Sequence, residues 1–155
     1  MKKSQLGVEF FLVLSVVVAF IVILYTTAFQ EIGKTRALND AVLSKAAVDA
    51  MAQGIDFAYL GGDGSVLQKQ LFVSQNSNCF YTTPSGLLKV YCTVSSEYLD
   101  VLTGGKEQVF SQELFTPRGK LVFFDCAPLN GGWVNVSIRN AISTLGFVNV
   151  SCRMA

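Results

Sequence analysis

Few side chains in this sequence are suited to chemistry, because histidine is absent altogether. Histidine is the commonest general base and metal ligand, so an enzyme would have to rely on carboxylates, hydroxyls or thiols. The serines and threonines have no histidine base, and the acids of the outer part are scattered: Asp56, Asp63, Glu97, Asp100, Glu107, Glu113 and Asp125. A lone acid among glycines, such as Asp63, is usually a turn residue rather than a calcium ligand. We therefore expect no enzyme, metal or cofactor.

The thiols are a second reactive group. The chain has four cysteines, all in its C-terminal part: Cys79, Cys92, Cys126 and Cys152. They lack the C-x-x-C spacing of zinc sites. An even number of dispersed cysteines downstream of an apolar segment indicates disulfides formed in an oxidising exterior, with reduced thiols in a small core as the alternative.

Glu9 is the third candidate, because it lies at the start of an uncharged apolar run. Phe10 to Phe29 reads FFLVLSVVVAFIVILYTTAF, and a helix of about twenty such residues crosses a hydrocarbon core. Ionisable groups at membrane depth are costly and usually paired. The positions next to Glu9 on a helix are uncharged: Gln5, Leu6, Leu12 and Val13. Its partner must be a chain terminus, another chain or interfacial water.

Charge also sets the expected orientation. Lys2 and Lys3 are the only charges before Glu9, so the positive-inside rule places the N-terminus in the cytoplasm and the chain beyond about residue 30 outside. One alternative is a conventional signal peptide cut after Ala28, which would release a soluble secreted module.

The segment Lys2-Lys3-Ser4 followed by Gln5-Leu6-Gly7-Val8-Glu9 resembles the class III signal peptide of archaeal type IV pilin-like proteins. There a short basic leader is cut immediately before a Q-x-S/G-x-E pattern, although Ser4 and Gly7 stand where the family usually has Gly or Ala and Ser. The resemblance implies a leader of residues 1–4, cleavage between Ser4 and Gln5 by a prepilin-type peptidase, and Glu9 as the fifth mature residue. In that family the glutamate meets the free amine of a neighbouring subunit, so Gln5 and Glu9 would serve assembly.

The resemblance further implies a structural subunit, major or minor, of an archaeal pilus-like surface filament. The precursor would lie in the membrane and then assemble with copies of itself or with related subunits. The outer domain would serve adhesion or surface interaction. The alternative is a single-span membrane protein that displays an extracellular binding domain and does not polymerise.

Composition agrees with an anchor plus one domain, because hydrophobic residues make up 51% and charged residues 15% of the 155 residues, with the apolar excess at the N-terminus. The net charge of +1 gives no field that would gather nucleic acid, and we expect no nucleic-acid partner.

The apolar helix should continue well beyond the membrane. No proline precedes Pro84, and Gly61-Gly62-Asp63-Gly64 is the first strong helix stop, so we predict one helix over residues 5–60. Its outer half has a mixed face, made of Leu38, Ala41, Val42, Lys45, Ala46, Asp49 and Gln53. The small residues there would pack against the chain's own domain or against helices of other subunits.

After Gly64 the pattern alternates, as in strands. The strand candidates are Val66 to Ser74, Leu87 to Val94, Glu107 to Ser111, Leu121 to Cys126, Trp133 to Arg139 and Phe147 to Cys152. The predicted fold is α+β, a long N-terminal hydrophobic helix followed by a small antiparallel β-sandwich-like domain over residues 61–155.

The register predicts which cysteines pair. If Ser85-Gly86 forms a two-residue turn, Thr82 lies opposite Lys89 and Cys79 opposite Cys92. On the other strands, Cys126 shares a face with Val122 and Phe124, and Cys152 shares one with Val148 and Val150. The predicted disulfides are therefore Cys79–Cys92 and Cys126–Cys152.

Two N-glycosylation sequons, Asn135-Val136-Ser137 and Asn149-Val150-Ser151, lie within the last two strand candidates. In each strand the Asn alternates with inward valines, so both Asn135 and Asn149 are predicted on the wet face. Glycans at these positions would suit an exported domain.

Overall fold

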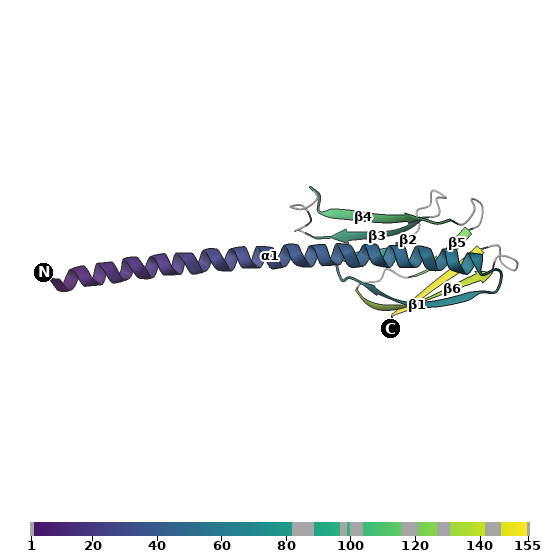
Figure 1. The fold of residues 1–155 in the computed structure, drawn as a ribbon, viewed down its shortest axis with the longest axis horizontal. Helices are drawn as coiled ribbons and strands as arrows, with labels where there is room; N and C mark the ends of the chain where they lie inside the picture. Colours follow the sequence, from purple (N-terminus) through teal and green to yellow (C-terminus); the bar gives the residue numbers. More distant parts are fainter. Residues whose placement is uncertain are drawn as a thin grey trace. The chain divides into compact units, whose positions relative to one another are not determined.

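The computed structural model describes residues 2–81, 89–96, 99, 104–115, 121–126, 131–141 and 147–154. The chain divides into two compact units, Met1–Arg36 and Ala37–Ala155, and each is described by itself. Helix α1 (Lys2–Leu60) forms the first unit and the N-terminal part of the second (Figure 1). The predicted long helix is thus confirmed.

The helix ends where the glycines predict. The N–H of Gly61 donates to the carbonyl of Phe57 at 2.9 Å, and the N–H of Gly62 donates to that of Tyr59 at 3.2 Å. Gly62 and Gly64 take φ values of 83° and 82°, a left-handed conformation that suits glycine at a helix C-terminus. The chain then turns into the first strand.

The described residues of unit 2 form two sheets. One has the order β1-β6-β7-β5 and the other β2-β3-β4 (Figure 1). The strands are β1 (Val66–Val73), β2 (Ser77–Tyr81), β3 (Lys89–Ser95), β4 (Glu107–Glu113), β5 (Leu121–Asp125), β6 (Gly132–Ala141) and β7 (Phe147–Met154). All six predicted strands are found. The remaining strand, β2, carries Cys79 and pairs with β3, as the predicted cysteine register required.

The antiparallel prediction holds for every described strand pair except one. β5 and β7 run parallel, with Val122 opposite Val148. No crossover helix is needed, because β6 is antiparallel to β7 and β7 returns along the sheet between β6 and β5. The alternating pattern of the sequence is the same for both directions of pairing, which is why the parallel pair was missed.

The predicted sandwich is not confirmed, because the two sheets lie on opposite sides of residues 37–60 of α1 (Figure 1). One side of the helix packs with residues of both sheets in a common core, and its other side stays exposed. Its buried stripe follows a four-three spacing and is widened by three further small residues: Ala37, Ala41, Ser44, Val48, Met51, Ile55 and Ala58, with Ala47, Ala52 and Gly54 beside them. The small residues therefore pack against the chain's own domain, one of the two expected options.

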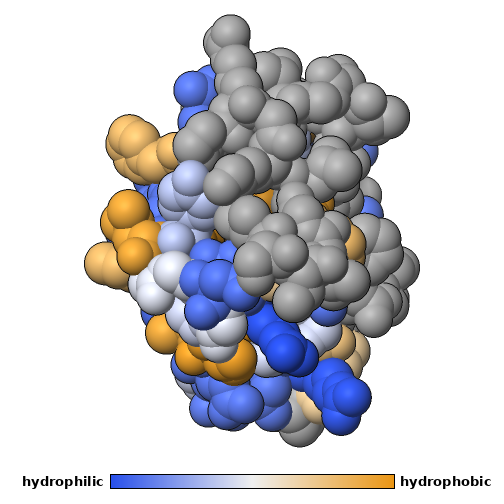
Figure 2. Space-filling model, turned by 90° about the vertical axis from the view of Figure 1, so that its right-hand side faces the viewer, coloured by the Kyte–Doolittle hydropathy of each residue, from blue (hydrophilic) through white to orange (hydrophobic). Residues whose placement is uncertain are grey.

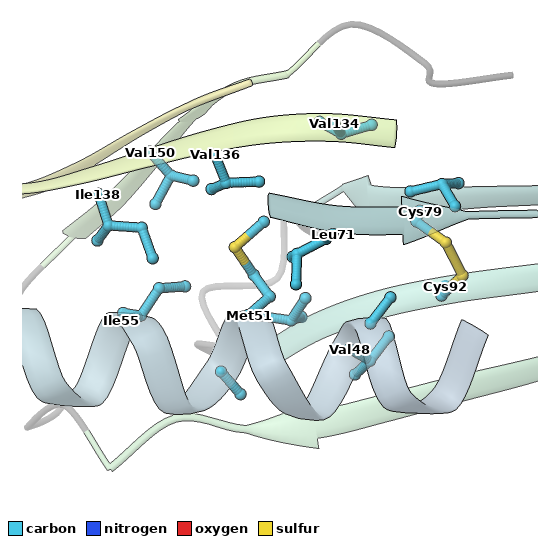
Figure 3. Packing of buried hydrophobic residues seen from close by; sticks show 14 of the residues in the cluster. Val48, Met51, Ile55, Leu71, Cys79, Cys92, Val134, Val136, Ile138 and Val150 are labelled. Carbon is cyan, nitrogen blue, oxygen red and sulfur yellow. A yellow bond between two sulfur atoms is a disulfide. The ribbon is translucent and has the colours of Figure 1, made fainter. Parts of the chain in front are cut away.

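The largest side chains of this stripe join both sheets in one core. Figure 3 shows Met51 and Ile55 directed toward Val136, Ile138 and Val150. The core also includes Leu71, Cys79 and Cys92 from β1, β2 and β3. A Cβ at Gly54 would lie 2.8 Å from Cδ1 of Ile138, so glycine there permits the close approach of helix and sheet.

The wet side of the helix matches most of the predicted mixed face. Leu38, Val42, Lys45, Ala46 and Gln53 are exposed, Asp49 is half-buried, and only Ala41 of that set is buried. At the end of unit 2 seen in Figure 2, the described surface is mixed, with small groups of hydrophobic residues between hydrophilic ones.

Candidate membrane and assembly segment

The apolar part of α1 in unit 1 is exposed on every side. Its large hydrophobic residues from Val8 to Ile32 are between 45% and 70% exposed. A helix that is hydrophobic all round belongs in a membrane or inside an assembly. From Val8 onward α1 is long and apolar enough to cross a membrane, by length and composition. This segment is the candidate site for membrane association.

The serine and threonine hydroxyls within this segment are satisfied by the helix itself. Ser15 Oγ donates to the carbonyl of Leu12 at 2.8 Å, and Thr26 Oγ1 donates to that of Ile23 at 2.9 Å. Thr27 Oγ1 also donates to the Ile23 carbonyl, at 2.9 Å. Such internal bonds remove the need for water and allow these residues to lie in lipid.

Glu9 differs from these hydroxyl residues. It is exposed on the helix surface, and the ion pairs of the described residues, Lys34–Glu31 and Lys89–Glu113, do not include it. A carboxylate needs a charged or hydrogen-bonding partner when it leaves water. Within the part of the chain that the structure describes, that partner is missing.

Ser4 and Gln5, the predicted cleavage pair, lie in the first turns of α1. The side chains of these two residues lie outside the described part of the chain. Nothing in the structure tests cleavage between them, which stays a prediction. The helical backbone continues without a break from there past Glu9, which places Gln5 one turn before Glu9 along the same helix.

Both predicted disulfides are present, Cys79–Cys92 and Cys126–Cys152. Cys79 lies directly opposite Cys92, as the hairpin register required. The register then shifts at a β-bulge between Cys79 and Tyr81, so that Tyr81 pairs with Tyr91. A bulge adds one residue to one strand. The register that we counted from a two-residue turn is therefore found at Cys79 and Cys92 but is shifted by one residue at Tyr81.

The turn itself, with Thr82 and Ser85-Gly86, lies outside the described residues. The second disulfide extends the parallel ladder of β5 and β7, in which Val122 pairs with Val148. Cys126 and Cys152 are half-buried and pack against the main core. The face assignment of these thiols is confirmed, although the strands that carry them are parallel.

The two sequons have different surroundings. Asn135 is exposed on the outer face of β6, as predicted, whereas Asn149 on β7 is half-buried. The Oδ1 atom of Asn149 is buried and has no hydrogen-bond partner among the described residues. β6 and β7 both lie inside the sheet, so a central strand position does not by itself account for the difference between the two asparagines. Only Asn135 is openly accessible.

Two polar residues of structural importance were not found from the sequence. Asn140, only 2% exposed, donates from Nδ2 to the carbonyls of Ala58 and Tyr59 at 3.1 and 3.3 Å. These carbonyls belong to the last turn of α1, where helical partners run out. No local sequence signal connects a strand asparagine with a helix end 81 residues earlier.

The second is Asp56, whose Oδ1 accepts a hydrogen bond of 3.0 Å from the backbone N–H of Phe115. This bond joins α1 to the segment after β4. Burial raises the pKa of Asp56, and the Phe115 hydrogen bond opposes that rise in part. On the sheet surface, Glu113 pairs with Lys89 at 2.6 Å and raises the pKa of that lysine.

Comparison with known proteins gave no match: no family model, curated protein or solved structure matches this chain. The functional argument therefore depends on the chain's own residues.

Proposed function

We propose that this chain is a structural subunit of a cell-surface filament of the archaeal type IV pilin-like kind. The proposal is supported above all by Glu9, an exposed carboxylate that has no ion-pair partner among the described residues, at the start of an apolar helix that is exposed all round. A membrane anchor alone has no use for an acid in this place. Assembly with other copies gives both the apolar surface and the acid a partner.

Removal of the leader explains how one helix serves two surroundings. Lys2 and Lys3 hold the precursor with its N-terminus in the cytoplasm, since a lysine in the membrane centre costs about 2.5–3.5 kcal/mol. Cleavage between Ser4 and Gln5 removes both lysines and creates an α-amine on Gln5. That amine, with an ordinary pKa of about 7.7–8.0, is cationic near neutral pH. It can pair with Glu9 of a neighbouring subunit.

In this proposal the charge pair forms between chains. The helix of the subunit leaves the bilayer and packs among the helices of other copies, where its exposed leucine, valine and phenylalanine side chains replace lipid contacts with protein contacts. Buried charges tolerate such surroundings only when paired. Glu9 thus makes assembly depend on correct axial register between neighbouring helices.

The mature N-terminus separates this proposal from its alternatives. Sequencing of the N-terminal peptide from the natural host should find Gln5. An N-terminus at Phe29 would indicate a released module, and one at Met1 a plain single-span anchor. Either result would overturn the filament proposal.

The role of the acid is tested by Glu9→Gln, which keeps size and polarity but removes charge. We expect normal membrane insertion with filaments lost from electron micrographs of the cell surface. Glu31→Gln is the matched control, because Glu31 is exposed on the same helix and pairs locally with Lys34 at 2.8 Å. Filaments at wild-type level from the Glu9→Gln chain would rule out the proposed pair.

A further inference from the structure

The outer face of the β1-β6-β7-β5 sheet carries a hollow of about 760 Å³ that the filament proposal does not use. Its described lining comes from β1, β6 and β7 and is mainly polar: Gln68, Lys69, Gln70, Asn135, Val136, Ser137, Ser151, Arg153 and Met154. The volume falls within the range of about 300–1,000 Å³ typical of small-molecule sites. No acidic side chain is among these described residues.

The strand register arranges the polar groups in rows across the sheet. Gln70 lies opposite Asn135, and Asn135 lies opposite Arg153. In the next row Gln68 lies opposite Ser137, and Ser137 opposite Ser151. Neighbouring strands are about 4.8 Å apart, so amide, hydroxyl and guanidinium groups present a dense set of donors and acceptors.

An aromatic pair borders these rows on the same face. Phe72 lies opposite Trp133 in the register, and their rings contact edge to face with centroids 5.4 Å apart. Trp133 is 56% exposed. Since Phe72 supports one side of the indole, the open part is held in place beside Asn135, two residues further along β6.

Arg153 gives the hollow its charge. It is exposed and takes no part in the ion pairs of the described residues. Lys69 does not add a second free cation to the hollow, because its Nζ reaches α1 and donates to the carbonyl of Ala50 at 3.3 Å. Arg153 can therefore offer its planar donors to a carboxylate in bidentate form.

From this juxtaposition we propose that the outer sheet face binds an acidic saccharide, of the hexuronic acid type, presented on another surface. Sugar hydroxyls match the amides and serine hydroxyls, the apolar face of a sugar ring matches Trp133, and the carboxylate matches Arg153. The inference rests on the display of the outer domain at the cell surface, where adhesion or surface interaction is expected of it, and it is independent of whether the chain polymerises.

The test uses the full chain in lipid nanodiscs, made in a host without N-glycosylation, against immobilised oligogalacturonate and a matched neutral galactose oligomer. We expect binding to oligogalacturonate at least tenfold tighter than to the neutral oligomer. Trp133→Ala and Arg153→Gln should each weaken that binding tenfold or more. Trp133→Phe should retain part of it, and Arg36→Gln, which removes a charge elsewhere, should bind normally.

Three results would overturn the proposal: no binding to oligogalacturonate, equal binding to the neutral oligomer, or unchanged binding by both variants. A second source of sugar is the chain's own glycan on Asn135. If the unglycosylated chain binds nothing while Trp133→Ala and Arg153→Gln expose the Asn135-linked glycan to glycosidases, the hollow holds that glycan instead.

Failure of this inference is distinguishable from failure of the filament proposal. Trp133→Ala and Arg153→Gln should leave filaments intact, whereas Glu9→Gln should abolish filaments and leave oligogalacturonate binding unchanged.

Discussion

The two parts of α1 share one backbone conformation and have opposite surroundings. Residues 8–32 are exposed in all directions, and most are large and apolar. Residues 37–58 bury one side, made of mainly small residues, in a core shared with both sheets. The first part has no packing partner among the described residues of its own unit, and the second finds its partner within its own chain.

The difference teaches that the distribution of apolar side chains around the helix, rather than helix propensity, decides what each part of α1 packs against. A stripe with four-three spacing matches one surface, so the outer half folds with its own domain. A helix that is apolar on every side suits lipid, which surrounds it uniformly, or a position among several neighbouring helices. One isoleucine from each part allows a direct test.

Ile55→Ala and Ile23→Ala remove the same atoms from the two parts of the helix. Ile55 is fully buried, whereas Ile23 is 58% exposed. Ile55→Ala should lower the free energy of unfolding of the domain by about 2–5 kcal/mol, because it leaves a cavity in the core. Ile23→Ala should change it by less than about 0.5 kcal/mol.

The measurement is denaturant unfolding in detergent micelles, followed by fluorescence of Trp133, the single tryptophan of the chain. Equal losses of stability for the two variants would mean that the apolar segment also supports the folded domain. The proposed contrast between the two parts of the helix would then be wrong.

Asn140→Ala tests how the packed part of the helix ends. The variant removes the two hydrogen bonds to the carbonyls of Ala58 and Tyr59 inside a buried site, so we expect a loss of about 1–3 kcal/mol in the free energy of unfolding. Asn78→Ala is the matched control, because Asn78 is exposed on β2 and should change stability by less than about 0.5 kcal/mol.

Hydrogen exchange locates the effect. Amides of the last turns of α1 should lose protection in Asn140→Ala, while those in the middle of the helix keep it. Unchanged protection of the last turns would show that the glycine turn and Ser65, which also donates to the Ala58 carbonyl, are sufficient to end the helix.

Local patterns predicted much of this fold. The absence of proline predicted the length of the helix, and the glycine cluster predicted its end. The alternation of apolar and polar residues predicted the strands that begin near Trp133 and Phe147. The pairing of Cys79 with Cys92 was predicted by counting outward from a turn, and it is found, although a bulge between Cys79 and Tyr81 shifts the register that the count assumed. These features depend on residues close in sequence, which is why a single chain was enough.

Features that depend on distant contacts were not predictable in this way. Alternation is identical for parallel and antiparallel strands, so the pairing of β5 with β7 was missed, and the bulge after Cys79 has no local signal. Both sequon asparagines alternate with buried valines on strands that have neighbours on both sides, yet Asn149 is half-buried and Asn135 is exposed. The exposure of a side chain on a sheet depends on its cross-strand neighbours, which alternation along one strand does not identify.

Asp56→Asn is the smallest and most selective test of the contact between α1 and the strands. The folded state raises the pKa of Asp56 above its ordinary 3.8, so it binds the proton more tightly than the unfolded chain does. The contribution of this group to stability therefore falls as pH rises from 3.8 through the raised pKa. At neutral pH the charged form works against the fold.

Asparagine keeps an oxygen that accepts the Phe115 N–H and never ionises. We expect Asp56→Asn to match or exceed the wild-type free energy of unfolding at pH 7 by up to about 0.5 kcal/mol, with the difference vanishing at low pH, where the wild-type carboxyl is protonated in both states. Asp56→Ala, which loses the hydrogen bond, should instead be less stable by about 0.5–1.5 kcal/mol. If Asp56→Asn is the less stable protein at pH 7, the carboxylate itself stabilises the packed part of the helix, and burial is not the dominant influence on that acid.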